Sequence, residues 1–584
     1  FSNNLLMGAA GQGGGYEIDQ SIRFDGSATL KRQWAQNGNR KTFTISMWVK
    51  IQGGTTQGLA TGSGDWGILQ IASDGILSIY DYGPSGYNWN LVSTARFRDP
   101  SAWYHVVAIC DTTQATSTDR VRLYVNGERL TSLTTATYPS LNFDCYTWGG
   151  TGGRSATTPQ GMFGYASNGL GYYAEGHYLD GVVGEPSAFG ETNDDGVWVP
   201  IEYSGSHGSE GCYLTGATAS DLGEDFSGND NDFTSAGLAT TDQMLDTPTN
   251  NHATWNVLNE WSDNVFSDGN LTITTLAPGY FRVPITTIGA TTGKFYCEMS
   301  FSDDGASNDV AFGIDDGKSA QGLSSLTDNT STTGGNFIGY KQNGDKYIGA
   351  TTSAFGATYA VGDVIGIALD LDDGTPHVEF YKNNSSEGTV NLVTTGIPYF
   401  FSAKTFSGAA VYTANFGQSA FTYTPPTGFV ALNTANLATP TISDGSKYFD
   451  TKLWTGNDTD GRAITGYNFS PDWVWIKSRS GAYSHNITDT VRGAGNFIQS
   501  NTTDVEVDGP GAFGSTLAFT SDGFTLDNGT TSNLYVNGDG VTYVGWGWEA
   551  NGSGSSNEDG ATTSTVSASA TSGFSIVKWT GTGA

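Results

Sequence analysis

Positive charge is scarce in this sequence. Its 584 residues contain 26 Lys and Arg against 58 Asp and Glu, which gives a formal net charge of −32. Binding to DNA or RNA draws affinity from Lys and Arg that neutralise phosphates, so we expect no nucleic-acid partner.

No run approaches the roughly 18 apolar residues of a membrane-spanning helix, and no signal peptide is visible. We therefore expect no membrane insertion. Because the sequence begins with Phe1, we expect that some residues precede it.

Cysteine and closely paired histidine are also scarce. No CxxC pair occurs among the four cysteines, which excludes a small disulfide scaffold and a zinc ribbon. We interpret Cys110, which ends the apolar run VVAIC, as a buried core thiol. No HExxH motif occurs, and the six histidines are scattered. We expect neither a metal nor another cofactor. The residues concerned are Cys110, Cys145, Cys212, Cys297, His105, His177, His207, His252, His377 and His485.

Helical periodicity is missing as well, and strand patterns fill the chain. Segments such as TFTISMWVKI (42–51), WYHVVAIC (103–110) and RVRLYVNGERL (120–130) alternate or run apolar over strand lengths. Gly, Asn and Asp clusters separate them, and Gly alone contributes 81 residues. Short strands with Gly-rich turns favour β-sandwiches over parallel α/β sheets. We predict an all-β chain of tandem β-sandwich (jelly-roll) domains, elongated and multi-domain.

Composition shifts suggest where the domains begin and end. Residues 1–20 read as an N-terminal arm with a Gly-rich hinge at Gly11–Gly15. We predict a first sandwich with a long polar connection over 21–250, a second over 251–435 and a third β domain over 436–573.

A sequence echo marks the end of the third domain. YFDTKLWTGND (448–458) is echoed by FSIVKWTGTGA (574–584), with Trp454 matching Trp579. We therefore predict that residues 574–584 begin a further repeat of the same module.

Two families resemble the first two domains. RFDGSATL (23–30), TISMWVK (44–50), WYHVVAI (103–109), RLYVNGERL (122–130) and YLDGVVGEPSAF (178–189) occur in an order that resembles a laminin-G-like, concanavalin A-like jelly roll. In the second domain, GKFYCEMSF (293–301), VAFGI (310–314), GDVIGIALDLDDG (362–374) and VEFYKNN (378–384) resemble a SPRY domain. The SPRY resemblance implies a bent β-sandwich that binds proteins and performs no chemistry.

A third resemblance covers the rest of the chain. GYNFSPDWVWIKSR (466–479) and YVGWGWEANG (543–552) are similar to modules of tail-fibre-like structural proteins of marine bacteriophages, and so is the arm that begins FSNNLLMGAAGQGGG. The order of the modules is also similar. The resemblance implies a virion protein on the particle surface, in a tail or fibre. It also implies other virion proteins as partners, and a homo-oligomer for which a trimer is plausible.

The strongest candidate ligand site is IYDYGPSGYNWN (79–90). Aromatic faces hold sugars against their C–H surfaces, while Asp and Asn bond their hydroxyls. The alternative is a hairpin whose alternate aromatics pack on the sandwich, and GYYAEGHYLDG (171–181) carries the same ambiguity. The tryptophan pairs Trp473/Trp475 and Trp546/Trp548 read as core or interface residues. The predicted glycan-binding residues are Tyr80, Asp81, Tyr82, Tyr87, Asn88 and Trp89.

Three motifs resemble functional sites of enzymes, but each lacks a feature that such a site needs. EIDQSI (17–22) echoes the E-x-D-x-E signature of β-glucanases, whose chemistry needs two carboxylates on one strand face, and the second Glu is missing. GPGAFG (509–514) matches G-x-G-x-x-G, but no helix follows, so we interpret it as a glycine turn. SGSHGSEG (204–211) holds Ser206, His207 and Glu210 on a Gly-rich loop, which we interpret as an exposed linker. We predict no catalytic residue.

Two acidic stretches require a choice between metal binding and turn formation. DFSGNDNDF (225–233) offers oxygen ligands of the kind calcium takes, but it lacks the Glu at the twelfth position of an EF-hand. Asx-rich turns without metal are the alternative. ALDLDDGTPHVEFYKNNSSEG (368–388) reads as a solvated hairpin, with Asp373-Gly374 in the turn and Asp370, His377 and Glu379 facing away from the core.

The expected function is that of a non-enzymatic virion fibre or tail-fibre-like adhesin. It would recognise a host-surface glycan or protein through loops of its sandwiches, strengthened by several copies acting together. One alternative is a jelly-roll enzyme that cleaves glycans, which would need a paired Asp/Glu across its groove. Another is a purely structural capsid or tail fibre without a receptor.

Overall fold

The computed structural model divides the chain into two compact units. Phe1–Asn193 with Val197–Pro440 form one unit, and Asp194–Gly196 with Thr441–Ala584 form the other. The residues that the structure describes are 15–33, 38–62, 67–148, 160–163, 169–259, 264–275, 283–304, 310–318, 336–349, 351–405, 410–440, 442, 444–509 and 511–581.

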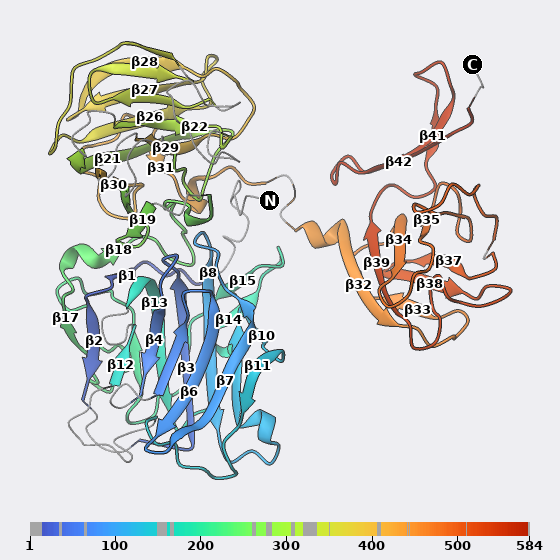
Figure 1. The fold of residues 1–584 in the computed structure, drawn as a ribbon, viewed down its shortest axis with the longest axis horizontal. Helices are drawn as coiled ribbons and strands as arrows, with labels where there is room; N and C mark the ends of the chain where they lie inside the picture. Colours follow the sequence, from blue (N-terminus) through green and yellow to red (C-terminus); the bar gives the residue numbers. More distant parts are fainter. Residues whose placement is uncertain are drawn as a thin grey trace. The chain divides into compact units, whose positions relative to one another are not determined.

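The first sandwich consists of two eight-stranded antiparallel sheets (Figure 1). In spatial order the first sheet contains β10 (Glu128–Arg129), β9 (Val121–Val125), β8 (Trp103–Asp111), β3 (Thr42–Lys50), β13 (Leu170–Asp180), β1 (Ser21–Asp25) and β18 (Gln243–Met244), and β16 (Cys212–Leu214) also pairs with β13. The second contains β11 (Leu133–Thr137), β7 (Gly86–Arg96), β6 (Ile76–Gly83), β5 (Gly67–Ile71), β4 (Gln57–Thr61), β12 (Gln160–Met162), β2 (Thr29–Arg32) and β17 (Thr234–Ala236).

The first sheet is covered on both faces. Its inner face packs against the second sheet through residues such as Ile45, Val106 and Tyr178. Its outer face carries two further clusters, around Trp48 and around Val107. All eleven residues of β13 are consequently buried. Burial on both faces explains why the central strands read as nearly continuous apolar runs. The predicted core thiol Cys110 is buried, and its Sγ lies 3.8 Å from that of Cys145, a proximity that the sequence did not indicate.

Part of the predicted N-terminal arm packs on this sandwich. Ile18 is buried, its backbone N–H donates to Thr249 Oγ1, and Thr249 donates back to its carbonyl. Tyr16 donates its hydroxyl to Glu175. The predicted hinge at Gly11–Gly15 lies outside the described residues except for Gly15.

The second sandwich consists of an eight-stranded and a five-stranded sheet, and its core includes Trp255, Phe312 and Tyr412. The larger sheet contains β19 (Asn264–Ser267), β20 (Thr272–Thr275), β30 (Ala410–Asn415), β21 (Lys294–Asp304), β26 (Ile365–Asp370), β27 (His377–Lys382) and β28 (Ser385–Asn391), and β31 (Val430–Ala431) pairs with β21. The smaller contains β25 (Thr351–Ala354), β24 (Asp345–Ile348), β23 (Ile338–Lys341), β22 (Ala311–Asp315) and β29 (Phe400–Lys404).

The acidic stretch at 368–388 is a hairpin, as the sequence predicted. β26 pairs with β27, and Leu369 and Phe380 are buried in the core. The prediction of a solvated Asp370 is wrong. This residue is buried, pairs with Lys294 at 2.6 Å and accepts the backbone N–H groups of Asp372 and Asp373. Its carboxylate therefore holds the turn together, and the pKa of Asp370 is lowered by these bonds despite its burial.

The second compact unit contains three small sheets. The five-stranded sheet contains β32 (Phe449–Thr455), β39 (Thr542–Trp548), β34 (Trp473–Ser478), β35 (Asn486–Asp489) and β36 (Phe497–Ile498). One three-stranded sheet contains β33 (Ala463–Thr465), β38 (Gly523–Asp527) and β37 (Ser515–Thr520), and the other contains β40 (Ser555–Asn557), β41 (Ser564–Ala568) and β42 (Ser575–Trp579).

The all-β prediction is confirmed, and so is the prediction of tandem sandwiches. No α-helix occurs in the part of the chain that the structure describes, only short 3-10 turns. No described helix is long and apolar enough to span a membrane. The expected boundary at 250/251 falls between β18 and β19, and the expected boundary at 435/436 falls within the 3-10 turn Thr434–Asn436. The remaining elements are β14 (Gly190–Thr192), β15 (Trp198–Pro200), η2 (Ser117–Asp119), η3 (Pro186–Ala188), η4 (Thr240–Asp242), η5 (Val257–Asn259), η6 (Thr434–Asn436) and η7 (Gly445–Lys447).

Candidate glycan-binding surface and buried polar clusters

The predicted glycan-binding stretch forms the hairpin of β6 and β7. Three tyrosines meet on the side of this hairpin that faces away from the core. The Tyr87 ring lies edge-to-face against Tyr80 at 5.2 Å and against Tyr82 at 4.9 Å between ring centroids. Tyr87 is 58% exposed, while the other two are half-buried. We name Tyr80, Tyr82 and Tyr87 the tyrosine surface.

Two of the six predicted residues do not reach this surface. Trp89 is fully buried in the core of the sandwich. Asp81 is also fully buried and accepts hydrogen bonds from Asn88 Nδ2 at 2.7 Å and from Thr147 N at 2.9 Å. It accepts two more from Tyr146 N and Thr147 Oγ1. These two side chains are inaccessible to a ligand because strand alternation turns them inward. Glycan binding by the tyrosines and Asn88 stays a prediction.

The second ambiguous aromatic stretch, residues 171–181, is resolved as packing. It forms β13 in the middle of the first sheet, where Tyr172, Tyr173 and Tyr178 are fully buried. Tyr173 donates its hydroxyl to the carbonyl of Gly58, and Tyr172 donates to that of Gly269. Desolvation raises the pKa of all three tyrosines.

A buried Ser–His pair lies on the outer face of the same sheet. Ser46 Oγ is 2.8 Å from His105 Nε2, and Trp198 Nε1 donates to His105 Nδ1 at 3.1 Å. An indole nitrogen can only donate, so Nδ1 is the acceptor and the proton of the neutral ring sits on Nε2. That proton points at Ser46. Because His105 donates to the hydroxyl, it cannot serve as the base that activates Ser46. Burial, together with the nearby His177, lowers the pKa of His105 to about 3.

A second polar group surrounds Glu175 beside this pair. Glu175 has a positive φ of 51° and accepts hydrogen bonds from the hydroxyls of Tyr213 at 2.7 Å and Tyr16 at 3.1 Å. His177 stacks on Tyr213 with 4.3 Å between ring centroids and lies 3.1 Å from His207 between Nδ1 and Nε2. The sequence scatters these five residues over almost 200 positions, so spacing alone did not reveal them. Ser46, His105, Glu175 and His177 line a gap that leaves no space for a water molecule, so packing holds them in place.

The loop SGSHGSEG (204–211) is not the exposed linker that the sequence predicted. Glu210 is buried, and His207 is half-buried against His177. Gly208 adopts φ +72°, and a Cβ there would lie 2.0 Å from the carbonyl oxygen of Asp180. The loop therefore lies directly on β13. Burial lowers the pKa of His207 to about 4, so the ring is neutral at pH 7.

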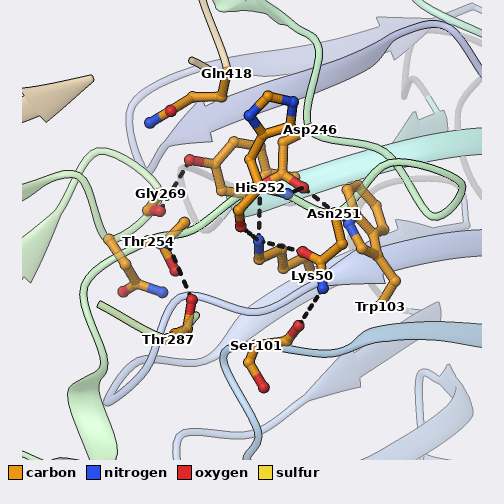
Figure 2. Close-up of polar contacts among 12 residues, drawn as sticks. Lys50, Ser101, Trp103, Asp246, Asn251, His252, Thr254, Gly269, Thr287 and Gln418 are labelled. Carbon is orange, nitrogen blue, oxygen red and sulfur yellow. Dashed lines mark hydrogen bonds and ion pairs between the residues drawn. The ribbon is translucent and has the colours of Figure 1, made fainter. Parts of the chain in front are cut away.

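A buried lysine connects the first sandwich to the start of the second (Figure 2). Lys50 Nζ donates to Asp246 Oδ2, Asn251 Oδ1 and the His252 carbonyl, each at 2.7 Å. Both Lys50 and Asp246 are fully buried. Trp103 Nε1 donates a hydrogen bond to the other carboxylate oxygen, Asp246 Oδ1, at 3.0 Å. Burial lowers the pKa of Lys50, an effect that Asp246 opposes. The cluster uses every ammonium proton for structure.

The candidate calcium stretch is closed by hydrogen bonds of its own. Asp225 accepts from the backbone of Tyr213, Ser227 and Asn231. Asp232 accepts from Asp225 N, and the Asn229 amide donates to two carbonyls of the neighbouring loop. No group of three or more metal-binding side chains occurs among the described residues. The arrangement is that of an Asx-rich turn.

The two remaining motifs are EIDQSI and GPGAFG. Glu17 and Asp19 of EIDQSI are exposed, with Ile18 buried between them. In GPGAFG, residues 511–513 form a turn that leads directly into β37, while Pro510 lies outside the described residues. As the sequence indicated, a strand and no helix follows the glycines.

The comparisons with known proteins agree with this architecture. A family model described as the concanavalin A-like lectin/glucanases superfamily matches residues 24–163. A second model, described as a domain of unknown function (DUF7483), matches residues 444–584. No curated protein sequence matches the chain.

Solved SPRY domains are also similar to part of the chain. A human SPRY domain is 17% identical, with 27% of this chain and 98% of that domain covered and a TM-score of 0.21. The SPRY domain of human HERC1 is 14% identical, with 27% and 94% covered and a TM-score of 0.23. The TRIM65 PSpry domain is 15% identical, with 28% and 89% covered and a TM-score of 0.22. Similarity of this degree carries no argument about function. The comparisons thus show that the first sandwich is similar to concanavalin A-like domains and that the third domain is similar to the DUF7483 domain.

Proposed function

We propose that this chain is a non-enzymatic binding protein whose first sandwich recognises a glycan through the tyrosine surface. The proposal rests on one observation. Three tyrosines pack edge-to-face on an exposed hairpin, and the buried Asp81 anchors the inner side of that hairpin. Such a surface is pre-organised, so little side-chain entropy is lost when a sugar ring covers it. Half-buried Asn88 donates its amide to the buried Asp81 and helps to hold the hairpin, so the tyrosine hydroxyls are the polar groups that would bond a sugar.

The chemistry of the buried clusters supports a binding role over a catalytic one. The tautomer of His105 leaves Ser46 without a base, and the network around Glu175 is packed without space for a substrate. A glycan-cleaving enzyme on this fold would need two carboxylates about 5–5.5 Å apart in an open groove. The carboxylates Asp81, Glu175 and Asp246 are all buried and hydrogen-bonded.

We further propose that the protein is a virion fibre or tail-fibre-like adhesin of a bacteriophage, located on the particle surface. The support is the resemblance of the arm and the third domain to such proteins, together with tandem β-sandwiches and the negative charge. Its partners would be other virion proteins and a host-surface glycan or protein. Weak single-site binding would gain strength from several copies on one particle.

The test of glycan binding uses Tyr87→Ala in the full chain, probed on immobilised host-surface polysaccharide. Loss of one sugar-stacking ring should weaken binding by about tenfold, a change of about 1.4 kcal/mol. The matched control is Leu141→Ala, an exposed apolar residue elsewhere on the same sandwich. Equal binding by both variants would contradict the tyrosine surface. Reducing ends released from the polysaccharide would instead establish the enzyme.

The test of location is labelling of the assembled particle with antibodies against this chain. Labelled tails or fibres, and blocked adsorption to the host, are the expected results. Labelled fibres with unimpaired adsorption would favour the structural alternative without a receptor.

A further inference from the structure

The five-stranded sheet of the third domain has two apolar faces, one buried in the core of the domain and one that Phe574 covers in part. The inner face contributes Val474, Ile476 and Tyr543 to the core, against Phe524 and Leu526 of the smaller sheet. Strand alternation places the residues between them on the other face. Strands that are apolar on both faces are typical of sheets that are buried on both sides.

The outer face is a continuous aromatic surface across three strands. Phe449, Trp548 and Trp473 lie opposite one another in register on β32, β39 and β34. Trp546 and Trp475 form the next row. Neighbouring rings are in contact, at 4.6 Å from Phe449 to Trp548, 4.8 Å from Trp548 to Trp473 and 5.4 Å from Trp475 to Trp546. We name Phe449, Leu453, Trp473, Trp475, Trp546 and Trp548 the tryptophan face.

The edge of this face is open to solvent. Phe449 is 41% exposed and Leu453 is 62% exposed, and both lie on β32, the edge strand of the sheet. Asp489, at the end of the first row, is already paired with Arg492. In a chain of net charge −32, a face whose rows otherwise consist of neutral side chains and Lys477 is where two copies can meet with least repulsion.

The sequence echo indicates what kind of segment covers the face. Aligning Trp454 with Trp579 places Phe449 opposite Phe574 in the two related segments. Both phenylalanines pack on the same indole, since Phe574 stacks on Trp548 at 5.9 Å and contacts Trp473 at 6.2 Å. The face thus already accepts the phenylalanine of a β32-like strand.

We propose that the tryptophan face is a docking surface for a second copy of this chain, which contributes the same face with its β32 edge. The contact is isologous, so Phe449 and Leu453 of each copy meet the indoles of the other. Exposed Val577 and Trp579 lie on β42, which begins directly after Phe574. This inference names one partner of the fibre under the proposed function, namely the chain itself, and it does not depend on glycan binding.

The test is sedimentation velocity of the full chain over a concentration series, with two matched variants. Leu453→Lys places a charge on the tryptophan face, and Leu517→Lys places the same charge at a 45% exposed position on β37 of the other sheet. We expect the unchanged chain and Leu517→Lys to self-associate alike. Leu453→Lys should weaken association by about tenfold or more, because the charge would be desolvated without a partner.

Three outcomes would overturn the inference. The unchanged chain sediments as a monomer at every concentration, or both variants associate equally, or oligosaccharide quenches the indole fluorescence of a monomeric chain. Far-ultraviolet circular dichroism and the unfolding midpoint show whether each variant is folded. Hydrogen exchange supplies an independent measurement, since β34 and β39 should gain protection at high concentration. Failure of glycan binding is distinguishable, because Tyr87→Ala should leave the association unchanged.

Discussion

Residues 79–90 and 171–181 are alike in composition but differ in their exposure to solvent. Both are rich in tyrosine and both form strands of the first sandwich. The β6–β7 hairpin exposes one of its two faces, so Tyr87 is open to solvent while Trp89 is buried. β13 is covered on both faces, and each of its residues is buried. The lesson is that the coverage of a sheet, which local sequence does not encode, decides whether its aromatics pack or bind.

We expect the largest loss of stability from a substitution of the buried Lys50. In Lys50→Met the Asp246 carboxylate stays buried without its cationic partner. We expect a loss of about 3–5 kcal/mol in the free energy of unfolding. Denaturant unfolding of the full chain measures it. The control is Arg96→Met, which removes an exposed ion pair with Asp74 and should cost less than about 1 kcal/mol. Similar losses in the two variants would contradict the structural role of the buried pair.

Truncating one tyrosine in each of the two stretches tests whether their aromatic rings differ in role. Tyr173→Ala removes a fully buried ring and its hydrogen bond to Gly58, so we expect a loss of about 3–5 kcal/mol. Tyr87→Ala removes an exposed ring and should change the free energy of unfolding by less than about 0.5 kcal/mol. Denaturant midpoints compare the two variants. If Tyr87→Ala destabilised the domain as strongly as Tyr173→Ala, the tyrosine surface would be a packing surface.

Asp81 links the open hairpin to the core. In Asp81→Ala the backbone N–H groups of Tyr146 and Thr147 lose their acceptor. We expect a loss of about 2–4 kcal/mol from these orphaned donors. Glycan binding should weaken as well, since Asn88 loses the bond that holds it. Unfolding and polysaccharide binding are measured on the same sample, with Asp74→Ala at an exposed position of the same sheet as control. An unchanged affinity in a folded variant would show that Asp81 does not position the surface.

Near neutral pH, the smallest effect on stability comes from the pH dependence of the buried histidine. Burial lowers the pKa of His105 from 6.5 to about 3, so only the unfolded chain takes up this proton between those values. Stability is therefore complete above pH 6.5 and falls as the pH drops, by at most about 1.4 kcal/mol per pH unit for this group. His105→Gln should flatten the acid limb of the curve of unfolding free energy against pH. Tyr87→Ala should leave that slope unchanged, and equal slopes in the His105 variant would contradict the assignment.

Strand patterns predicted much of the fold. The alternation in 365–382 gave the β26–β27 hairpin and its inward residues, and the order of the motifs over 23–189 indicated the jelly roll. The burial of Asp370, Glu210 and His207 was missed, because their partners come from distant segments or from backbone groups. The candidate site was half predicted. Residues 79–90 were identified as a hairpin with aromatics on it, but the inward turn of Asp81 and Trp89 depends on strand register.

The sequence by itself determined that this protein is β throughout, rich in aromatics and strongly acidic, because the two-residue period and the net charge are local and additive properties. Tertiary structure decided which side chains are accessible. It brought Lys50 to Asp246 across 196 positions and covered β13 on both faces, whereas the tyrosine surface was left exposed. The physical reason is that burial depends on which faces meet, and faces meet only when segments far apart in the chain pack together.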